Sequence, residues 1–140
     1  MGDEPQWLDA RVELDDVQGL WGGRRIAIGG AGRLVVQVVE PGQWERRFEL
    51  TVEPDEWRRL VALLIENNLL TIQPAERAGI PDEARPSLTV VNAAGECWSV
   101  SKWAGVKDER FDAVYAALRR LETLTVHLDP VYRGPFRPGA

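Results

Sequence analysis

The strongest periodic pattern in the chain runs through residues 53–70, EPDEWRRLVALLIENNLL. Pro54 suits the first helical position, where its missing N–H would have had no intrahelical partner. Asn67 and Asn68 suit the other end, since asparagine tolerates the left-handed conformation that ends helices. Large apolar residues between them recur with a period of about 3.6 residues, and they are Trp57, Leu60, Val61, Leu64 and Ile65. The pattern predicts an amphipathic helix on whose apolar face the other elements pack.

Alternating or β-branched runs before and after this helix predict strands at 24–28, 33–39, 44–52, 87–92 and 96–103. The clearest alternation is at 44–52, where Trp44, Phe48 and Leu50 share one face and Glu45 and Arg47 the other. A second helix is predicted after Asp108, which can cap it, with an apolar stripe of Phe111, Val114, Tyr115, Leu118 and Leu121. The prediction is an α+β fold: an antiparallel sheet of about five strands, a three-strand meander plus a hairpin, with two helices packed on one face.

The two faces of this sheet differ in what can cover them. If both helices lie on one face, the other carries Glu45, Arg47 and Glu49 together with valines of the 33–39 run. A mixed face of this kind can be covered by the termini, by a second copy of the chain or by a partner.

The glycine-rich segment 29–32, GGAG, allows two interpretations. Glycine-rich turns can cradle phosphates, but such a site needs a helix to follow at once, with its N-terminal amides directed at the phosphate. The run RLVVQVV follows instead, and β-branched residues favour a strand. A hairpin turn is therefore the preferred interpretation.

The predicted domain covers residues 19–125. Residues 1–18 are expected to form an acidic N-terminal arm, because they hold six acidic residues against Arg11 alone. Residues 126–140 are expected to form a tail without regular structure, because three prolines and two glycines interrupt them. The tail can wrap over the domain or remain free.

The segment 71–86, TIQPAERAGIPDEARP, is a long predicted loop, and long loops in small domains often carry function. Asp82, Glu83 and Arg85 form a local charge cluster inside it. One interpretation is a turn initiated by the acids and anchored by Arg85. The other is a recognition loop in which Asp82 and Arg85 contact a partner or ligand.

The composition disfavours nucleic-acid binding and membrane association. The net charge of −5 disfavours a general nucleic-acid or anionic-membrane surface, and no apolar run approaches the ~20 residues that span a bilayer. The single cysteine, Cys97, is typical of a reducing compartment, so a cytoplasmic location is expected.

The chain offers few groups for catalysis. Its only histidine is His127 and its only cysteine is Cys97, so neither a metal-ligand cluster nor a His-oriented triad is expected. We expect no cofactor, no metal and no catalytic residue.

Six tryptophans are the most unusual feature of the composition. Tryptophan is enriched at binding hot spots because one rigid side chain buries a large area and keeps a donor, but it also fills the cores of small domains. Trp57 belongs to the helix stripe, whereas Trp44, Trp98 and Trp103 lie at strand ends or in the hairpin and are the candidates for partner contact.

The order meander, helix, loop, hairpin, helix resembles a family of uncharacterised bacterial domains with a loose "PDEARP…G" pattern. The matching positions are 81–86, Leu88, Val90 and Gly95. The resemblance implies this architecture and no activity. The leading functional hypothesis is a non-enzymatic protein-interaction module, self-associating or with another protein. The alternative is a small-molecule-binding or hydrolytic domain that uses the 80–86 loop.

Overall fold

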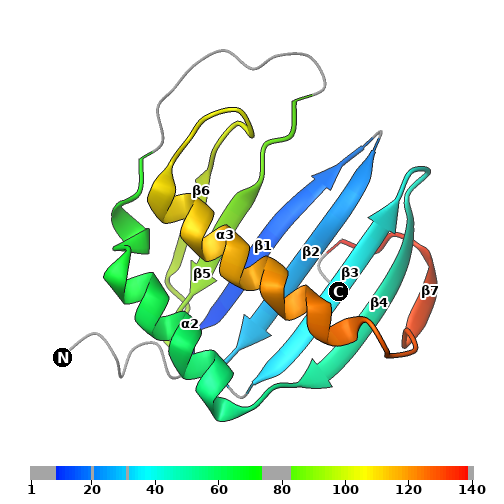
Figure 1. The fold of residues 1–140 in the computed structure, drawn as a ribbon, viewed down its shortest axis with the longest axis horizontal. Coiled ribbons are helices and arrows are strands. Elements are labelled where there is room, and N and C mark those ends of the chain that lie inside the picture. Colours follow the sequence, from blue (N-terminus) through cyan, green and yellow to red (C-terminus); the bar gives the residue numbers. More distant parts are fainter. Residues whose placement is uncertain (1–8, 20, 31, 74–82, 139–140) are drawn as a thin grey trace.

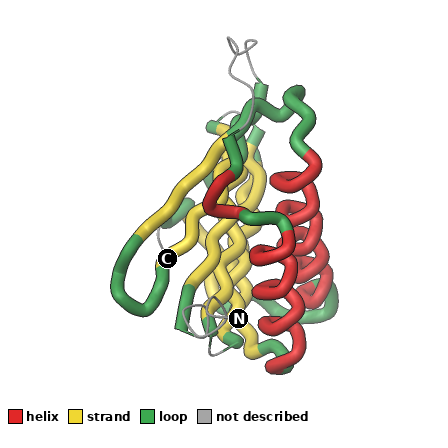
Figure 2. The backbone as a smooth tube through the Cα atoms, turned by 90° about the vertical axis from the view of Figure 1, so that its left-hand side faces the viewer, coloured by secondary structure: helices red, strands yellow, loops and turns green. Residues whose placement is uncertain are grey.

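The computed structural model describes residues 9–19, 21–30, 32–73 and 83–138. Seven strands form one antiparallel sheet in the order β6-β5-β1-β2-β3-β4-β7 (Figure 1). Both longer helices, α2 and α3, lie on the same side of this sheet (Figure 2). The predicted α+β class and the placement of two helices on one face are confirmed.

The strands are β1 (Arg11–Gln18), β2 (Gly22–Gly29), β3 (Arg33–Glu40), β4 (Trp44–Thr51), β5 (Ser87–Val91), β6 (Cys97–Ser101) and β7 (Tyr132–Pro135). The helices are α2 (Pro54–Glu66) and α3 (Glu109–Glu122), with short 3₁₀ turns η1 (Leu69–Thr71) and η2 (Thr123–Thr125). The predicted meander is β2-β3-β4 and the predicted hairpin is β5-β6. Strands β2 and β3 pair in antiparallel register on either side of the glycine-rich segment, as expected of a hairpin, and Ala31 of that segment lies outside the described residues.

The sheet has seven strands rather than about five, because both segments assigned to the termini contribute one. Residues 11–18, expected in an acidic arm, form β1 between β2 and β5. Val12 and Leu14 of β1 are fully buried against the helices. The intervening acids, Glu13 and Asp15, lie on the other face, where Arg25 of β2 pairs with both. Two of the acids that indicated an arm are thus paired across strands.

The tail was also expected to lack regular structure, yet β7 pairs with β4. Pro135 is tolerated in β7 because β7 is an edge strand. An N–H on its outer side would have no neighbouring strand to bond, so its absence costs no hydrogen bond of the sheet. The chain then crosses the sheet face opposite the helices. There the backbone N–H of Arg137 donates to the Glu45 carboxylate, so the tail covers part of that face.

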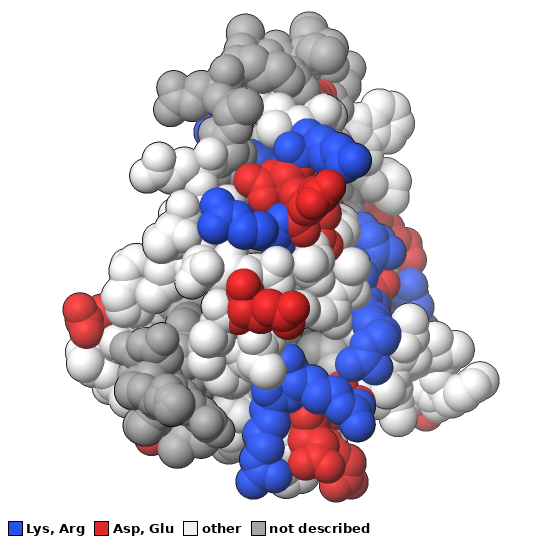
Figure 3. Space-filling view, turned by 60° about the vertical axis from the view of Figure 1, so that its left-hand side comes forward, with Lys and Arg blue, Asp and Glu red and all other residues white. Residues whose placement is uncertain are grey.

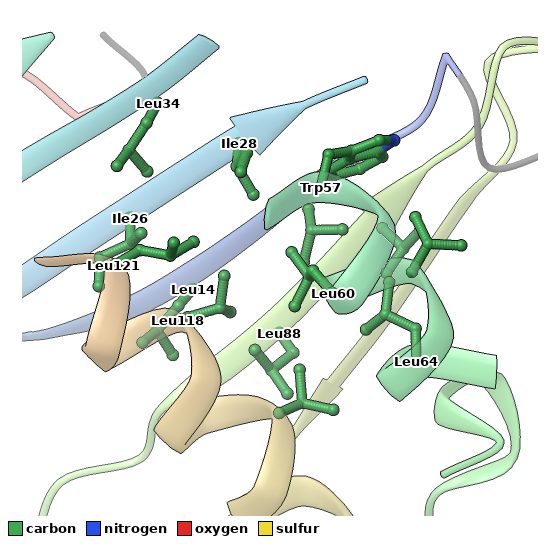
Figure 4. Close-up of a cluster of buried hydrophobic side chains, with 14 of the residues drawn as sticks. Leu14, Ile26, Ile28, Leu34, Trp57, Leu60, Leu64, Leu88, Leu118 and Leu121 are labelled. Atoms are coloured by element: carbon green, nitrogen blue, oxygen red, sulfur yellow. The ribbon is translucent and has the colours of Figure 1, made fainter. Parts of the chain in front are cut away.

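The core lies between the sheet and the two helices (Figure 4). Side chains of β1, β2 and β3 on the helix side point at Leu60 and Leu64 of α2 and Leu118 and Leu121 of α3. The helix ends match their sequence signals. The side chain of Asp108 accepts hydrogen bonds from the N–H groups of Arg110 and Phe111, and Asn68 has a φ of 48°, in the left-handed region.

Candidate functional site

The predicted binding residues divide between opposite edges of the sheet. Trp98 lies on β6 and Trp44 on β4, five strand positions apart. At about 4.8 Å per strand spacing, the two positions are about 24 Å apart. They therefore belong to two separate candidate surfaces.

At the β6 edge, Arg85 and Trp103 meet. The Arg85 guanidinium carbon lies 4.9 Å from the centre of the Trp103 ring, a cation–π contact. The neighbouring backbone is tied together as well, since the N–H of Ala104 donates to the carbonyl of Ala84 at 2.8 Å. Trp98 and Trp103 are both half-buried. Asp82 lies outside the described residues.

A pocket of about 380 Å³ lies beside this loop, between residues 84–86, 102–107 and the first turns of α3. Lys102 is buried at its wall. Its Nζ donates to the carbonyl oxygen of Val106 at 2.6 Å and lies 3.1 Å from Asp112 Oδ1. The ammonium group is thus paired within the protein.

Tyr115 forms another polar part of this pocket. Its hydroxyl donates to Asp16 Oδ2 and lies within hydrogen-bond reach of Arg119. Burial raises the pKa of the Tyr115 hydroxyl because the phenolate would lose solvation, and the hydrogen bond to Asp16 raises it further. The hydroxyl therefore stays protonated and acts as a donor.

The opposite edge, where β4 pairs with β7, gathers exposed apolar side chains. Seven large hydrophobic side chains are exposed among the described residues, and five of them lie here. Trp44, half exposed, is on β4. The other four belong to the segment between α3 and β7, and they are Leu124, Val126, Leu128 and Val131. Such a concentration is typical of an interaction surface.

A groove of about 370 Å³ opens at this edge, between β3, β4, β7 and the end of α3. We call it the arginine groove, because Arg46 of β4, Arg119 of α3 and Arg133 of β7 line it. Its apolar lining consists of Val38, Phe48, Val126, Leu128 and Pro130, and its acidic lining of Glu122 and Asp129.

Sequence patterns identified only part of this surface. Trp44 was predicted as a candidate, but Val126 and Leu128 were assigned to a tail without structure. Trp21, which is 62% exposed, lies in the turn between β1 and β2. Its turn is tied to the β3–β4 turn by a hydrogen bond from Gln43 Nε2 to the carbonyl of Gly19.

Within the described ranges, no group of three or more His, Cys, Asp or Glu side chains is placed to hold a metal ion. In the same ranges, no helix has the length and apolar character needed to cross a bilayer. Cys97 is exposed on β6 and forms no disulfide.

The chain matches no protein-family model, and the comparison with curated proteins gives no relative.

Proposed function

We propose that this protein is a non-enzymatic, cytoplasmic protein-interaction module that binds a partner protein at the arginine groove and the apolar side chains beside it. The observation that carries the proposal is the gathering of five exposed hydrophobic side chains at one edge of the sheet, next to a groove. Interfaces combine an apolar centre with tryptophan and arginine, which are the residue types found here.

The charge distribution supports a protein partner rather than nucleic acid. Figure 3 brings forward the left-hand side of Figure 1, away from the β4–β7 edge, and there Lys and Arg side chains lie interleaved with Asp and Glu side chains. A nucleic-acid surface concentrates positive charge on one face, and the net charge of −5 opposes it. The unpaired thiol of Cys97 supports a reducing compartment.

The test begins with an affinity capture of partners from a lysate of the native host, identified by mass spectrometry. The binary affinity of the purified partner is then measured for the wild type and for Trp44→Ala and Val126→Asp. We expect each substitution to weaken binding by about tenfold or more, since hot-spot residues contribute about 1–2 kcal/mol or more.

The matched control is Leu70→Asp, because Leu70 is also an exposed hydrophobic residue but follows α2, away from the groove. It is expected to bind as the wild type does. Circular dichroism confirms that all variants remain folded. Unchanged affinity in both groove variants would overturn the proposal. A dimer in light scattering that Val126→Asp dissociates would identify the partner as a second copy.

A second candidate is small-molecule binding in the pocket beside residues 84–86. The buried ammonium group of Lys102 in the lining favours it, because small-molecule pockets hold a few well-placed polar groups. Its pairing with Asp112 and Val106 gives it a structural role as well, so this candidate ranks second. A ligand found by thermal-shift screening should lose its stabilising effect in Lys102→Met, while Arg58→Met, an exposed position on α2 outside this pocket, serves as the control.

A further inference from the structure

Arg46 and Arg133 occupy directly opposite positions on neighbouring antiparallel strands. The N–H of Phe136 donates to the carbonyl of Gln43 at 2.8 Å, and this pairing makes Arg46–Arg133 a non-hydrogen-bonded pair. Side chains approach more closely in such pairs than in hydrogen-bonded ones. Two like charges in this position destabilise a sheet, so the arrangement requires an explanation.

Nearby carboxylates neutralise the positive charges of Arg46 and Arg133 only in part. Arg46 Nε lies 3.6 Å from Glu40 Oε1, but the atom is buried and makes no hydrogen bond to the described residues. Arg133 forms no ion pair or hydrogen bond with any of them. Asp129 lines the same groove without pairing with either arginine.

Arg119 adds a third guanidinium group from the opposite wall. Its Nε lies 3.4 Å from Glu122 Oε1 and is likewise buried without a hydrogen-bond acceptor in the described part of the chain. Glu122 also accepts a hydrogen bond from Arg24 Nε at 3.0 Å, so one carboxylate serves two arginines. The groove therefore keeps an excess of positive charge in a chain whose net charge is −5.

We infer that the arginine groove binds an acidic segment of the partner protein in which carboxylates alternate with apolar side chains. Carboxylates would bridge Arg46 and Arg133 through charge-assisted hydrogen bonds, for which guanidinium groups are well suited. Apolar neighbours in the segment would pack on Phe48, Val126 and Leu128. A free phosphate ion would bind the arginines but would make no contact with these apolar side chains. The inference rests on the proposed function and names the partner chemistry of that surface.

The test is a selection from a display library of random short peptides on the full-length protein. We expect the enriched peptides to combine Asp or Glu with large apolar residues. One enriched peptide is then synthesised with a fluorescent label, together with a version in which Asn and Gln replace its acids. The acidic peptide should bind Arg46→Gln and Arg133→Gln about tenfold to a hundredfold more weakly than the wild type, the loss expected for one charge-assisted hydrogen bond.

Arg58→Gln is the control, because Arg58 is an exposed arginine on α2, outside the groove, that pairs with Asp55. It should bind the acidic peptide as the wild type does. Competition with inorganic phosphate distinguishes a site for peptide carboxylates from a site for a phosphate group. Weak competition by phosphate supports the peptide site. Full displacement at concentrations at which chloride has no effect would assign the groove to a phosphate group and overturn the inference.

Selection of neutral or basic peptides, failure to select any peptide, or equal binding by Arg133→Gln would also overturn it. These results are distinct from a failure of the proposed function. If the natural partner still depends on Trp44 and Val126 while acidic peptides do not bind, the interaction surface stands and only its partner chemistry is wrong.

Discussion

The carboxylate of Glu45 accepts a hydrogen bond from the backbone N–H of Arg137 at 2.9 Å, across 92 positions of sequence. Glu45 is completely buried. Its two oxygens also accept hydrogen bonds from Gln37 Nε2 and Arg47 at 2.9 and 3.0 Å. The guanidinium carbons of Arg47 and Arg137 lie 4.7 and 4.2 Å from the centre of the nearby Tyr132 ring. One buried carboxylate thus joins β3, β4 and the C-terminal segment.

Replacing this carboxylate should destabilise the protein strongly. In Glu45→Ala the Arg47 guanidinium and the Arg137 N–H lose a buried acceptor, and we expect the free energy of unfolding to fall by about 2–5 kcal/mol. Urea denaturation followed by tryptophan fluorescence measures the change. Glu49→Ala, on the same strand and face, removes only a more exposed pair with Arg33 and should cost less than about 1 kcal/mol. Equal losses in the two variants would contradict this role of Glu45.

Removing one arginine of the cross-strand pair should stabilise the isolated protein. Arg133→Gln relieves like-charge repulsion worth about 0.2–1 kcal/mol, so we expect the Tm to rise by about 1–4 °C. Scanning calorimetry at low salt checks this, and adding Arg46→Gln should bring no further gain, because one substitution already removes the repulsion. A lower Tm in Arg133→Gln would show that other groups of the protein already balance the positive charges of Arg46 and Arg133.

Leu64 is the position on α2 where truncation should cost most. It is 1% exposed and packs between the sheet and α3. We expect Leu64→Ala to lower the free energy of unfolding by about 2–5 kcal/mol because it leaves a cavity. Leu70→Ala removes an exposed leucine of the same size and should change it by less than about 1 kcal/mol. An unchanged denaturation midpoint in Leu64→Ala would exclude this face of α2 from the core.

Tyr115 should make stability depend on alkaline pH. Its pKa is raised above the ordinary 10.0 by burial and by the hydrogen bond to Asp16. The folded state therefore keeps the proton after the unfolded state has lost it, and stability falls as pH rises above 10.0 toward the folded pKa. Below pH 10.0 this contribution is fully present.

Tyr115→Phe removes this titration, so the wild type should lose stability faster than the variant above pH 10.0. Urea midpoints measured across the alkaline range test it, and tyrosinate absorbance follows the titration directly. Tyr132→Phe is the control for general alkaline effects. Parallel pH profiles for wild type and Tyr115→Phe would contradict the raised pKa.

Local physical chemistry made much of the fold predictable. The apolar stripe of Leu60 and Leu64 specifies α2 because a helix must bury such a face. Asp108 specifies the start of α3 because its side chain satisfies N–H groups that have no intrahelical partner. The alternation around Phe48 specifies a half-buried strand. These signals need no information from distant residues.

Tertiary structure decided the rest. Residues 11–18 form an inner strand because Val12 and Leu14 are buried on one face, while Arg25 pairs with Glu13 and Asp15 on the other. The tail becomes β7 because β4 offers an unpaired edge and Glu45 a buried acceptor. The arginine groove exists because β4, α3 and β7 bring Arg46, Arg119 and Arg133 together from distant parts of the chain. The sequence alone thus determined the helices, the meander and the hairpin, whereas strand order and the candidate binding surface depend on long-range pairing that no local pattern encodes.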